Sequence, residues 1–442
     1  MAHRPSSGPP GQSDSLLTQR KHSGLLTAGL ACLSTASCLN ASPSHPPVTM
    51  PARSHTPAAV ASASADPTYQ PSPTARPNPA GLSDAQMVGQ LFIGYVYGSS
   101  ASAATPAQRA ANIALYGEPL GAQIVGRWHL GGIILLDHNS LDPARPLLST
   151  GNVDSSRQIR NLTTGLQAAA EADSHLLLLI GTDQEGGRVQ RLTHEVTNRP
   201  TQRTLAALTP TALRCSYFTL GRQLRALGIN QDYAPVADVL TTSGGVIGDR
   251  SFGPDPSRDA TDVTAASRGL REAGVLATLK HWPGHGSTST DSHAALAVIH
   301  ESAQLWRASD RVPFAAAATQ AGAVMVGHLA LPALDPSGLP ATLSPTLVNG
   351  ALRQELGFTG LALTDSLYME PMQVAGSPSQ IGLRVLAAGE DMLLESPNLP
   401  EVYATLLQAV HTSRTIRAQV VAAVGRILRT KALLEQTPRS TC

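Results

Sequence analysis

Short apolar runs recur along the chain from Leu82 onward, and longer segments of helical pattern separate them. Most of these runs are apolar throughout instead of alternating with polar residues, which is typical of strands buried on both faces of a parallel sheet. We expect eight strands, at Gln90–Gly94, Gly131–Leu136, Leu176–Ile180, Ile229–Pro235, Val275–Leu279, Ala323–Val326, Leu361–Leu363 and Met392–Leu394.

The segments between these runs are rich in Ala, Leu and Arg and predict helices, for example over Ser156–Ala172 and Pro210–Leu227. Eight alternating strand and helix units in roughly 350 residues fit a (β/α)8 barrel of the TIM type with insertions. We therefore predict an α/β fold with a single catalytic barrel domain over residues 81–433. An open, doubly wound parallel sheet is the alternative that the pattern leaves open.

Polar residues stand at the ends of several of these runs. In a barrel, the C-terminal ends of all strands open onto one mouth, where active sites lie. We therefore expect these side chains to converge, although they are far apart in the sequence. They are Asp183, Lys280, His281, His328 and Asp365, with Asp232 inside a run.

The segment Gly357–Met369 ends a predicted strand on the carboxylate of Asp365. A glycosidase that works by double displacement needs a carboxylate to attack the anomeric carbon and to stabilise its positive charge. An aspartate after a strand also commonly caps the next helix. Taken alone, Asp365 fits the cap better than the nucleophile.

The segment Lys280–His293 is the densest polar stretch in the chain, and its Pro and Gly residues predict a long loop that leaves a strand. Asp291 and His293 are two residues apart, so the carboxylate can orient the imidazole for proton transfer near neutral pH. The alternative is metal ligation by these two residues with His281 and His285. No HExxH motif and no His-x-His pair after the first strand supports it, so we expect no catalytic metal.

The segment Gly181–Arg191 combines Asp183 with a Gly-Gly turn and two arginines. Asp183 can accept hydrogen bonds from sugar hydroxyls, which need paired acceptors once they leave water. The glycines could also suggest a phosphate cradle, but the chain has no GxxxxGK[ST] motif. This segment fits sugar binding and a plain surface turn equally well. Arg250, in the segment Gly248–Gly253, adds a cation near the mouth, and it supports sugar binding only together with the other site residues.

The charge balance argues against a nucleic-acid partner. The chain has 442 residues, of which 14% are charged and 42% hydrophobic, with 32 Lys and Arg against 31 Asp and Glu. A net charge of +1 offers no electrostatic footprint for a phosphate backbone. Three Trp, eight Tyr and five Phe are also few for base-stacking platforms.

The cysteines predict no structural disulfide framework and no thiolate zinc site, because no CxxC pair occurs. A bond between the last two of them is compatible with the sequence but cannot be deduced from it. The four cysteines are Cys32, Cys38, Cys215 and Cys442.

Residues 1–39 have the layout of a secretory signal. The basic stretch Arg20–His22 precedes the short apolar stretch Gly24–Ala31, and small residues at Thr35–Ser37 precede Cys38. The apolar stretch is too short for a transmembrane helix. The residues before Cys38 resemble a lipoprotein-processing box with Thr in the place of the usual Leu, so we expect an extracytoplasmic enzyme, secreted or held at the cell membrane by a lipid on Cys38.

Two alternatives remain for this leader: free secretion after cleavage near Ala41, or a start that lies too far upstream. Residues 40–80 consist mainly of Ala, Ser, Pro and Thr, which cannot bury enough apolar area to offset their ordering entropy. We expect a disordered linker there, and a short C-terminal tail over residues 434–442.

Together these segments resemble glycoside hydrolase family 3, and within it the single-barrel β-N-acetylglucosaminidases. The resemblance extends from about Leu82 to Lys431, and five motifs in the same order make it specific. Trp282 stands where Phe is frequent, and Asp365 lies in Thr-Asp-Ser instead of the commoner Ser-Asp-Asp. The matching segments are Asp183–Arg191, Ala234–Val239, Gly248–Phe252, Lys280–His293 and Gly357–Met369.

The resemblance implies a retaining, exo-acting β-N-acetylhexosaminidase with a TIM-type barrel and no cofactor. Asp365 would be the nucleophile, and His293 the acid/base with Asp291 as its partner. The substrate would be a terminal β-linked N-acetylglucosamine, as in muropeptides from peptidoglycan, and we expect a monomer. The residues implied to hold the sugar are Asp183, Arg191, Arg250, Lys280 and His281.

Two other functions remain as alternatives. Some relatives transfer the sugar to phosphate, so the chain could be a phosphorylase instead of a hydrolase. An inactive sugar-binding lipoprotein is the other alternative, and it is disfavoured because every catalytic group that the resemblance implies is present.

Overall fold

The structure of the chain is a computed structural model that describes residues 79–242, residues 245–436 and Cys442. The chain divides into two units, Met1–Gln70 and Pro71–Cys442, and every described residue belongs to the second. The predicted leader, with Cys32 and Cys38, and all but the end of the predicted linker lie outside the described residues. Among the residues described, no helix is long and apolar enough to cross a bilayer.

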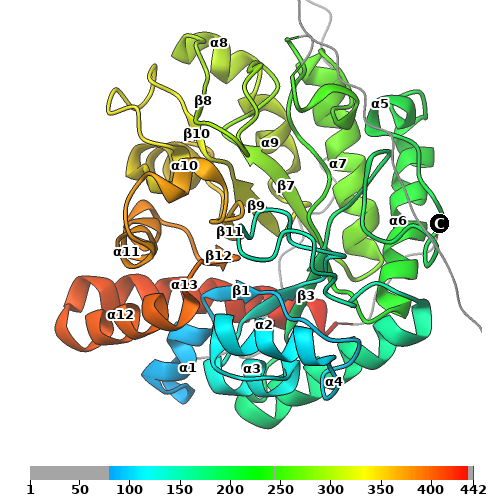
Figure 1. Ribbon diagram of the computed structural model, residues 1–442. Coiled ribbons are helices and arrows are strands. Elements are labelled where there is room, and N and C mark those ends of the chain that lie inside the picture. Colours follow the sequence, from blue (N-terminus) through cyan, green and yellow to red (C-terminus); the bar gives the residue numbers. More distant parts are fainter. Residues whose placement is uncertain (1–78, 243–244, 437–441) are drawn as a thin grey trace, which may run out of the picture. The chain divides into compact units, whose positions relative to one another are not determined.

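Eight parallel strands form the central sheet of the second unit (Figure 1). Each overlaps one of the eight predicted runs, and most are apolar because a strand that is covered on both faces favours apolar side chains in both directions; β6, with Gln231 and Asp232, is polar. The strands are β1 (Phe92–Gly94), β2 (Gly132–Ile134), β3 (Leu179–Thr182), β6 (Gln231–Asp232), β7 (Leu276–Trp282), β9 (Ala323–Val326), β11 (Leu361–Thr364) and β12 (Leu393–Leu394).

The sheet closes on itself. Its strand order is β11-β9-β7-β6-β3-β2-β1-β12, and Leu363 of β11 forms a parallel bridge with Met392 at the start of β12. The amide of Thr364 also donates to the carbonyl of Met392 over 3.0 Å. This closure excludes the open, doubly wound sheet and confirms the predicted (β/α)8 barrel.

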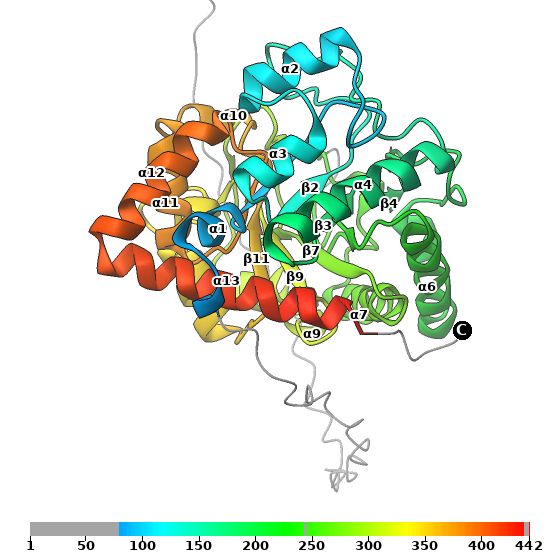
Figure 2. The same ribbon diagram turned by 90° about the horizontal axis from the view of Figure 1, so that it is seen from below.

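Helices surround the strands on all sides (Figures 1 and 2). The predicted helices at 156–172 and 210–227 are confirmed as α4 and α6. The described α-helices are α1 (Asp84–Gly89), α2 (Pro106–Tyr116), α3 (Gly121–Trp128), α4 (Ser156–Ser174), α5 (Gln202–Leu205), α6 (Pro210–Ala226), α7 (Pro256–Glu272), α8 (Ala303–Ala308), α9 (Arg311–Ala317), α10 (Glu370–Gln373), α11 (Pro378–Ala388), α12 (Leu399–Thr412) and α13 (Arg414–Leu434).

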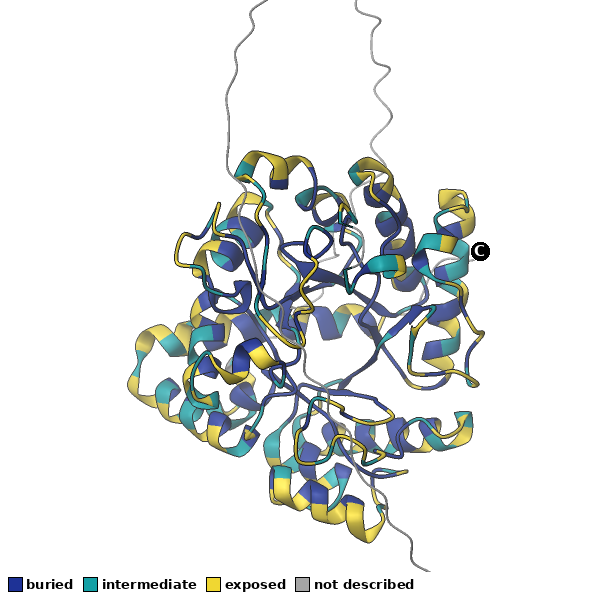
Figure 3. Cartoon of the chain, turned by 45° about the horizontal axis from the view of Figure 1, so that its top comes forward, coloured by how far each residue is buried: buried dark blue, intermediate teal, exposed yellow. Residues whose placement is uncertain are grey.

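Local sequence explains where the longer helices begin and which face they bury. Helix α6 starts with the side chain of Thr209, which accepts from the amide of Ala212, and Pro210 occupies its first position. Leu213, Leu220 and Leu224 form its buried stripe, as the helical period requires. The same division holds throughout, since buried residues face the barrel and exposed residues cover the outer helix faces (Figure 3).

Strand β7 is longer than the apolar run predicts. The run ends at Leu279, but the strand continues through Lys280 and His281 to Trp282, so these two polar residues lie in the strand and not in the loop after it. The indole N–H of Trp282 donates to the carbonyl of Leu347 over 3.0 Å, and its ring packs edge-on against Trp306. This fully buried indole fixes the end of the strand beside the polar pair.

A disulfide joins Cys215 on α6 to Cys442, with 5.3 Å between their Cα atoms. The expectation of no structural disulfide was therefore wrong for this pair. Sequence alone contains no information on the distance between two residues that are 227 positions apart.

Candidate active site

The predicted site residues lie at the C-terminal ends of the barrel strands. Asp183 follows β3, Lys280 and His281 lie near the end of β7, and Asp365 follows β11. Arg250 comes from the short 3-10 helix η2 (Gly248–Arg250), in the segment after β6. Because all eight strands are parallel, their ends meet at one mouth, and the structure brings these residues together there.

A network of buried charges forms one part of the site. Lys280 Nζ lies 2.8 Å from Asp183 Oδ1 and 2.7 Å from Glu185 Oε1. Arg250 binds both carboxylate oxygens of Glu185, through Nε and Nη2, each at 2.8 Å. Arg191 Nη2 lies 3.4 Å from Asp183 Oδ2 and is more exposed to solvent. Such bidentate and charge-assisted contacts hold the side chains in one fixed geometry.

The charges of this network keep its carboxyl groups ionised. Burial alone would raise the pKa of Asp183, but the charges of Lys280 and Arg191 more than offset it, so the pKa lies below its usual value. For Glu185 the burial effect is again opposed by Arg250 and Lys280, and the pKa is held far below its usual range. Asp183 therefore offers ionised acceptor oxygens to sugar hydroxyls near neutral pH.

Asp238 fixes the orientation of His281. Its Oδ2 lies 2.8 Å from His281 Nδ1, and its Oδ1 accepts from the backbone amides of His281 and His285, at 3.0 and 2.8 Å. With Nδ1 engaged by a carboxylate, Nε2 is the ring nitrogen left to face the site, and it lies 3.4 Å from Arg250 Nη2. His281 is thus a rigid binding group.

Asp365 is only partly covered by the protein and is surrounded by imidazoles. Its Oδ1 accepts from the amide of Ser366 over 2.8 Å. Burial would raise the pKa of Asp365, but His281, His328 and His293 lower it further than burial raises it, so the pKa lies below its usual value. The group is consequently a carboxylate at neutral pH, the form that a nucleophile requires.

His293 and Asp291 form a hydrogen-bonded pair on the loop after β7. Nδ1 of the imidazole lies 2.7 Å from Asp291 Oδ1, which also accepts from the backbone amide of His293 over 2.9 Å. Burial raises the pKa of Asp291 less than the contacts with His293 lower it, so the carboxyl group stays ionised. Both side chains are about half exposed, at 48% and 51%. The arrangement leaves Nε2 of His293 available for proton transfer.

The His293 loop and Asp365 lie on the same side of the barrel. The carbonyl of His293 accepts from the amide of Glu370, five residues after Asp365, over 3.3 Å. The charge of the His293 imidazole also contributes to the low pKa of Asp365. The two segments that the sequence separates by some seventy residues therefore border one mouth.

His285 anchors the loop that carries this pair. Its Nδ1 lies 2.7 Å from Thr288 Oγ1, and its Nε2 lies 3.0 Å from Ser292 Oγ, the residue between Asp291 and His293. Burial lowers the pKa of His285, which keeps the ring neutral. Within the described ranges, no group of three or more His, Cys, Asp or Glu side chains is arranged to hold a metal ion.

Sequence reasoning gave no role to four groups that belong to this site. Glu185 lies inside a motif that it singled out, and Asp238 lies in another. His328 was noted at a strand end only; its Nε2 lies 2.9 Å from the carbonyl of Ser366, next to Asp365. Glu395 follows the eighth strand directly, so the strand-end rule that found Asp183 could also have found it.

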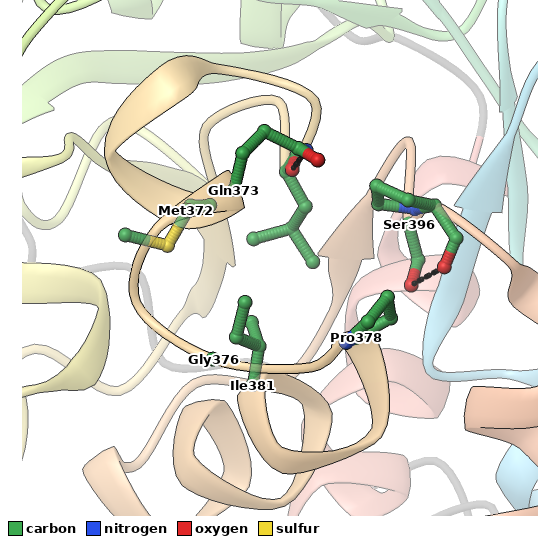
Figure 4. A pocket seen from close by; sticks show the side chains of 8 residues that line it. Met372, Gln373, Gly376, Pro378, Ile381 and Ser396 are labelled. Carbon is green, nitrogen blue, oxygen red and sulfur yellow. Dashed lines mark hydrogen bonds between the residues drawn. The ribbon is translucent and has the colours of Figure 1, made fainter.

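A small cavity of about 60 Å³ lies beside the site, between the segments that follow β11 and β12 (Figure 4). Leu367 and Met372 border it on one side, and Ser396 with Pro397 on another. The cavity has room for a few waters but is too small for a sugar ring. It therefore belongs to the support of the Asp365 segment and not to the substrate site.

The structure is a closed (β/α)8 barrel with ion-paired acids and a carboxylate near imidazoles at its C-terminal mouth, the end at which barrel enzymes hold their active sites. A family model described as "Glycosyl hydrolase family 3 N terminal domain" matches residues 121–430. The chain belongs to glycosyl hydrolase family 3, as the sequence motifs predicted.

Similar proteins include β-hexosaminidase A of Pseudoalteromonas piscicida, 31% identical over 81% of this chain and 62% of its own length. Among solved structures, a family 3 β-N-acetylglucosaminidase from Paenibacillus sp. is 32% identical with a TM-score of 0.70, over 82% of this chain and 65% of its own. A β-N-acetylhexosaminidase from Beutenbergia cavernae is 28% identical with a TM-score of 0.68, over 79% and 99%. The chain thus spans less than two thirds of the length of the first two.

Proposed function

We propose that this chain is a retaining, exo-acting β-N-acetylhexosaminidase that releases terminal β-linked N-acetylglucosamine. The observation that carries the proposal is the position of Asp365 directly after β11, at the mouth that it shares with the His293–Asp291 pair. Similarity to proteins called β-hexosaminidase and β-N-acetylglucosaminidase supports the same substrate class. Fragments of peptidoglycan are the natural substrates that we propose.

In the first step, a carboxylate oxygen of Asp365 attacks the anomeric carbon, and the bond to the leaving oxygen breaks. His293 gives the proton on Nε2 to that oxygen, while Asp291 holds the imidazole through Nδ1. In the second step, His293 takes a proton from water, the water oxygen attacks the anomeric carbon, and Asp365 leaves as a carboxylate. Two inversions give net retention.

Binding of the sugar is the task of the buried charge network. Asp183 accepts from hydroxyl groups, and Lys280 and Arg250 donate to sugar oxygens. His281 contacts the sugar through Nε2, while Glu185 and Asp238 hold these side chains in place. Hydroxyl groups that leave water lose free energy unless each finds a partner, so a rigid set of donors and acceptors selects the ring that fits it. Arg191 completes the set at the more exposed edge.

Water is the acceptor that this site favours over phosphate. The cations of the network each face a carboxylate, since Lys280 contacts Asp183 and Glu185, and Arg250 contacts Glu185. A phosphate dianion would have to compete with these pairs for its counter-charge. We therefore expect free N-acetylglucosamine, and no sugar 1-phosphate, as the product in phosphate buffer.

A panel of 4-nitrophenyl glycosides tests the function. The β-N-acetylglucosaminide should be cleaved at least tenfold faster than the β-glucoside, with the β-N-acetylgalactosaminide as the third substrate. Equal or faster cleavage of the glucoside would contradict the proposed substrate class. The same reactions with EDTA should run at unchanged rate, because no step uses a metal.

We further propose that the enzyme acts outside the cytoplasm and is held at the membrane by a lipid on Cys38. The leader pattern of residues 20–38 supports this, and these residues lie outside the described part of the structure. Mass spectrometry of the N-terminus of the mature protein, purified from its own cell envelope, decides the matter. A diacylated Cys38 is expected, and an unmodified N-terminus at another residue would contradict it.

A further inference from the structure

Glu395 is the residue at which strand β12 opens onto the barrel mouth. Its amide donates to the carbonyl of Ile93 over 2.8 Å, so its backbone still belongs to the barrel. Its side chain is 5% exposed and is therefore held inside the protein. The mechanism above assigns no role to it.

The backbone at Glu395 is in the left-handed region, with φ of 51°. Three other described residues besides glycine share this property: His129 and His175 end helices, and Asn398 precedes helix α12. Glu395 alone of the four stands at the end of a barrel strand. Such strained residues persist where the surrounding structure requires them, and they gather at active sites.

The left-handed turn changes the direction of the Glu395 side chain. Leu393 points outward, since a Cβ atom on Gly382 of α11 would lie 3.6 Å from its Cδ2. In a regular strand, the side chain two residues further on points the same way, which would send Glu395 towards the helices. Instead, its Oε1 accepts from Asn139 Nδ2, in the loop after β2, over 3.0 Å. The carboxyl group thus reaches across the end of β1 at the mouth.

The charges of both functional carboxylates act on the carboxyl group of Glu395. Burial raises the pKa of Glu395 to about 7, and the negative charges of Asp183 and Asp365 add to this effect, while Ser366 and Arg191 oppose it. Near neutral pH the group therefore exists in both forms and can accept or donate a hydrogen bond. Its backbone stands at the end of β12, and its carboxyl group is held by Asn139 at the mouth.

The strand order shows which edge of the sugar this group faces. Three strands separate β3 from β11 in either direction around the barrel, so Asp183 and Asp365 stand on opposite sides of the mouth. Lys280 and His281 lie on the arc through β6, β7 and β9. Glu395 and Asn139 follow strands of the other arc, which runs through β2, β1 and β12. A ring that spans the two acids therefore turns one edge towards each arc.

We propose that Glu395 binds the 6-hydroxyl of the sugar and so determines which substituent the enzyme accepts at that carbon. Glu395 accepts from Asn139, and the charges of Asp183 and Arg191 act on it; a hydroxyl group can hydrogen-bond to such a carboxyl group, whereas the methyl of an acetamide cannot. The opposite edge of the ring, with its acetamide, then faces the arc of Lys280 and His281. This inference rests on the proposed function, and it adds a residue to it.

The test combines a variant with a changed substrate. Wild-type enzyme and Glu395→Gln are assayed on 4-nitrophenyl N-acetyl-β-glucosaminide and on its 6-deoxy analogue. We expect the variant to lose about tenfold or more in kcat/KM on the parent substrate but less than threefold on the analogue, because the lost contact is absent there. Equal losses on both substrates, or none on either, would overturn the inference.

Glu390→Gln is the matched control. Glu390 is also a fully buried glutamate and lies just before the other end of β12, with no hydrogen bond to either carboxylate oxygen. This variant should leave the ratio of the kcat/KM values for the two substrates unchanged.

If Glu395→Gln does not fold, Asn139→Ala replaces it in the test. That variant removes the hydrogen bond that holds Glu395, and an equal loss of kcat/KM on both substrates would again refute the proposal. Failure of wild-type enzyme to cleave the parent substrate would instead refute the proposed function.

Discussion

The two halves of the catalytic mouth are built differently. The binding half consists of Asp183, Glu185, Lys280 and Arg250, whose carboxylates and cations pair inside the protein and rest on strands or short turns. The acid/base half consists of Asp291 and His293, a half-exposed pair on a loop that touches the rest of the mouth through few contacts. The first half is rigid because breaking any pair leaves a buried charge, whereas the second can adjust to leaving groups of different size.

The comparison predicts separate consequences for the two halves. Substitutions in the binding half should reduce stability together with activity, whereas substitutions in the acid/base half should reduce activity alone. Asp365 is linked to both, since His281, next to Lys280 on β7, and His293 of the acid/base half both lower its pKa.

Asp365→Asn should remove the nucleophile while the fold remains. We expect kcat/KM for 4-nitrophenyl N-acetyl-β-glucosaminide to fall by about 10⁴-fold or more, because no other group can form the covalent bond. Circular dichroism and the melting temperature should stay close to those of the wild type. Turnover within tenfold of the wild type in a pure sample would remove Asp365 from the mechanism.

Glu185→Ala should be the most destabilising change in the binding half. It leaves Arg250 without its buried partner and Lys280 with Asp183 alone, so we expect the free energy of unfolding to fall by about 3–5 kcal/mol. Urea titration measures this quantity. The control is Glu355→Ala, which breaks the more exposed pairs with Arg307 and Arg311 and should cost less than about 1 kcal/mol. Similar losses of unfolding free energy in both variants would show that the buried pairs stabilise the fold no more than the exposed ones do.

His293→Ala should impair chemistry and leave stability unchanged. We expect a loss of about 10²- to 10⁴-fold on substrates with poor leaving groups, such as chitobiose, and a much smaller loss on activated aryl glycosides. Acid assistance matters less when the leaving group is already a weak base. If both substrate types lost activity equally, His293 would not be the acid in the first step.

Stability should depend on pH through Glu395 at the border between the two halves. Its folded pKa of about 7 lies above the usual value of 4.5, so the folded protein holds the proton more tightly than the unfolded chain. Its contribution is fully present below pH 4.5 and is lost as the pH rises through 7, which amounts to about 3 kcal/mol. Glu395→Gln cannot lose a proton. Its stability relative to the wild type should therefore rise between pH 5 and 8, and a constant difference would argue against a raised pKa.

The sequence predicted the barrel well because the barrel depends on a local property. A strand covered on both faces favours apolar residues at successive positions, and runs such as Leu361–Leu363 show this pattern whatever the rest of the chain does. The rule fails for Lys280 and His281, which continue β7. Acids from other strands compensate these side chains inside the barrel, and no local pattern shows such partners.

The sequence motifs indicated the candidate site residues that lie within them. They gave no role to groups whose place in the site depends on the three-dimensional arrangement of the chain. The motifs around Asp365 and His293 single out these residues in the sequence. Only the fold shows that both segments border the same mouth of the barrel. The place of Glu395 after the eighth strand could have been noted from the sequence, but the direction of its side chain could not, because strand alternation predicts that it points outward and a left-handed φ angle cannot be read from the residues. The bond between Cys215 and Cys442 could not be deduced either, because it depends on the distance between two residues that are far apart in the sequence.

The proposed mechanism depends most on a covalent bond between the sugar and Asp365. Incubation with 5-fluoro-N-acetyl-β-glucosaminyl fluoride, followed by protease digestion and mass spectrometry, shows which carboxylate carries the sugar. The label should be found on the peptide that contains Asp365 and should be absent from the Asp365→Asn protein. A label on Asp183 or Glu395, or wild-type enzyme that turns over the reagent and never carries it, would contradict the mechanism.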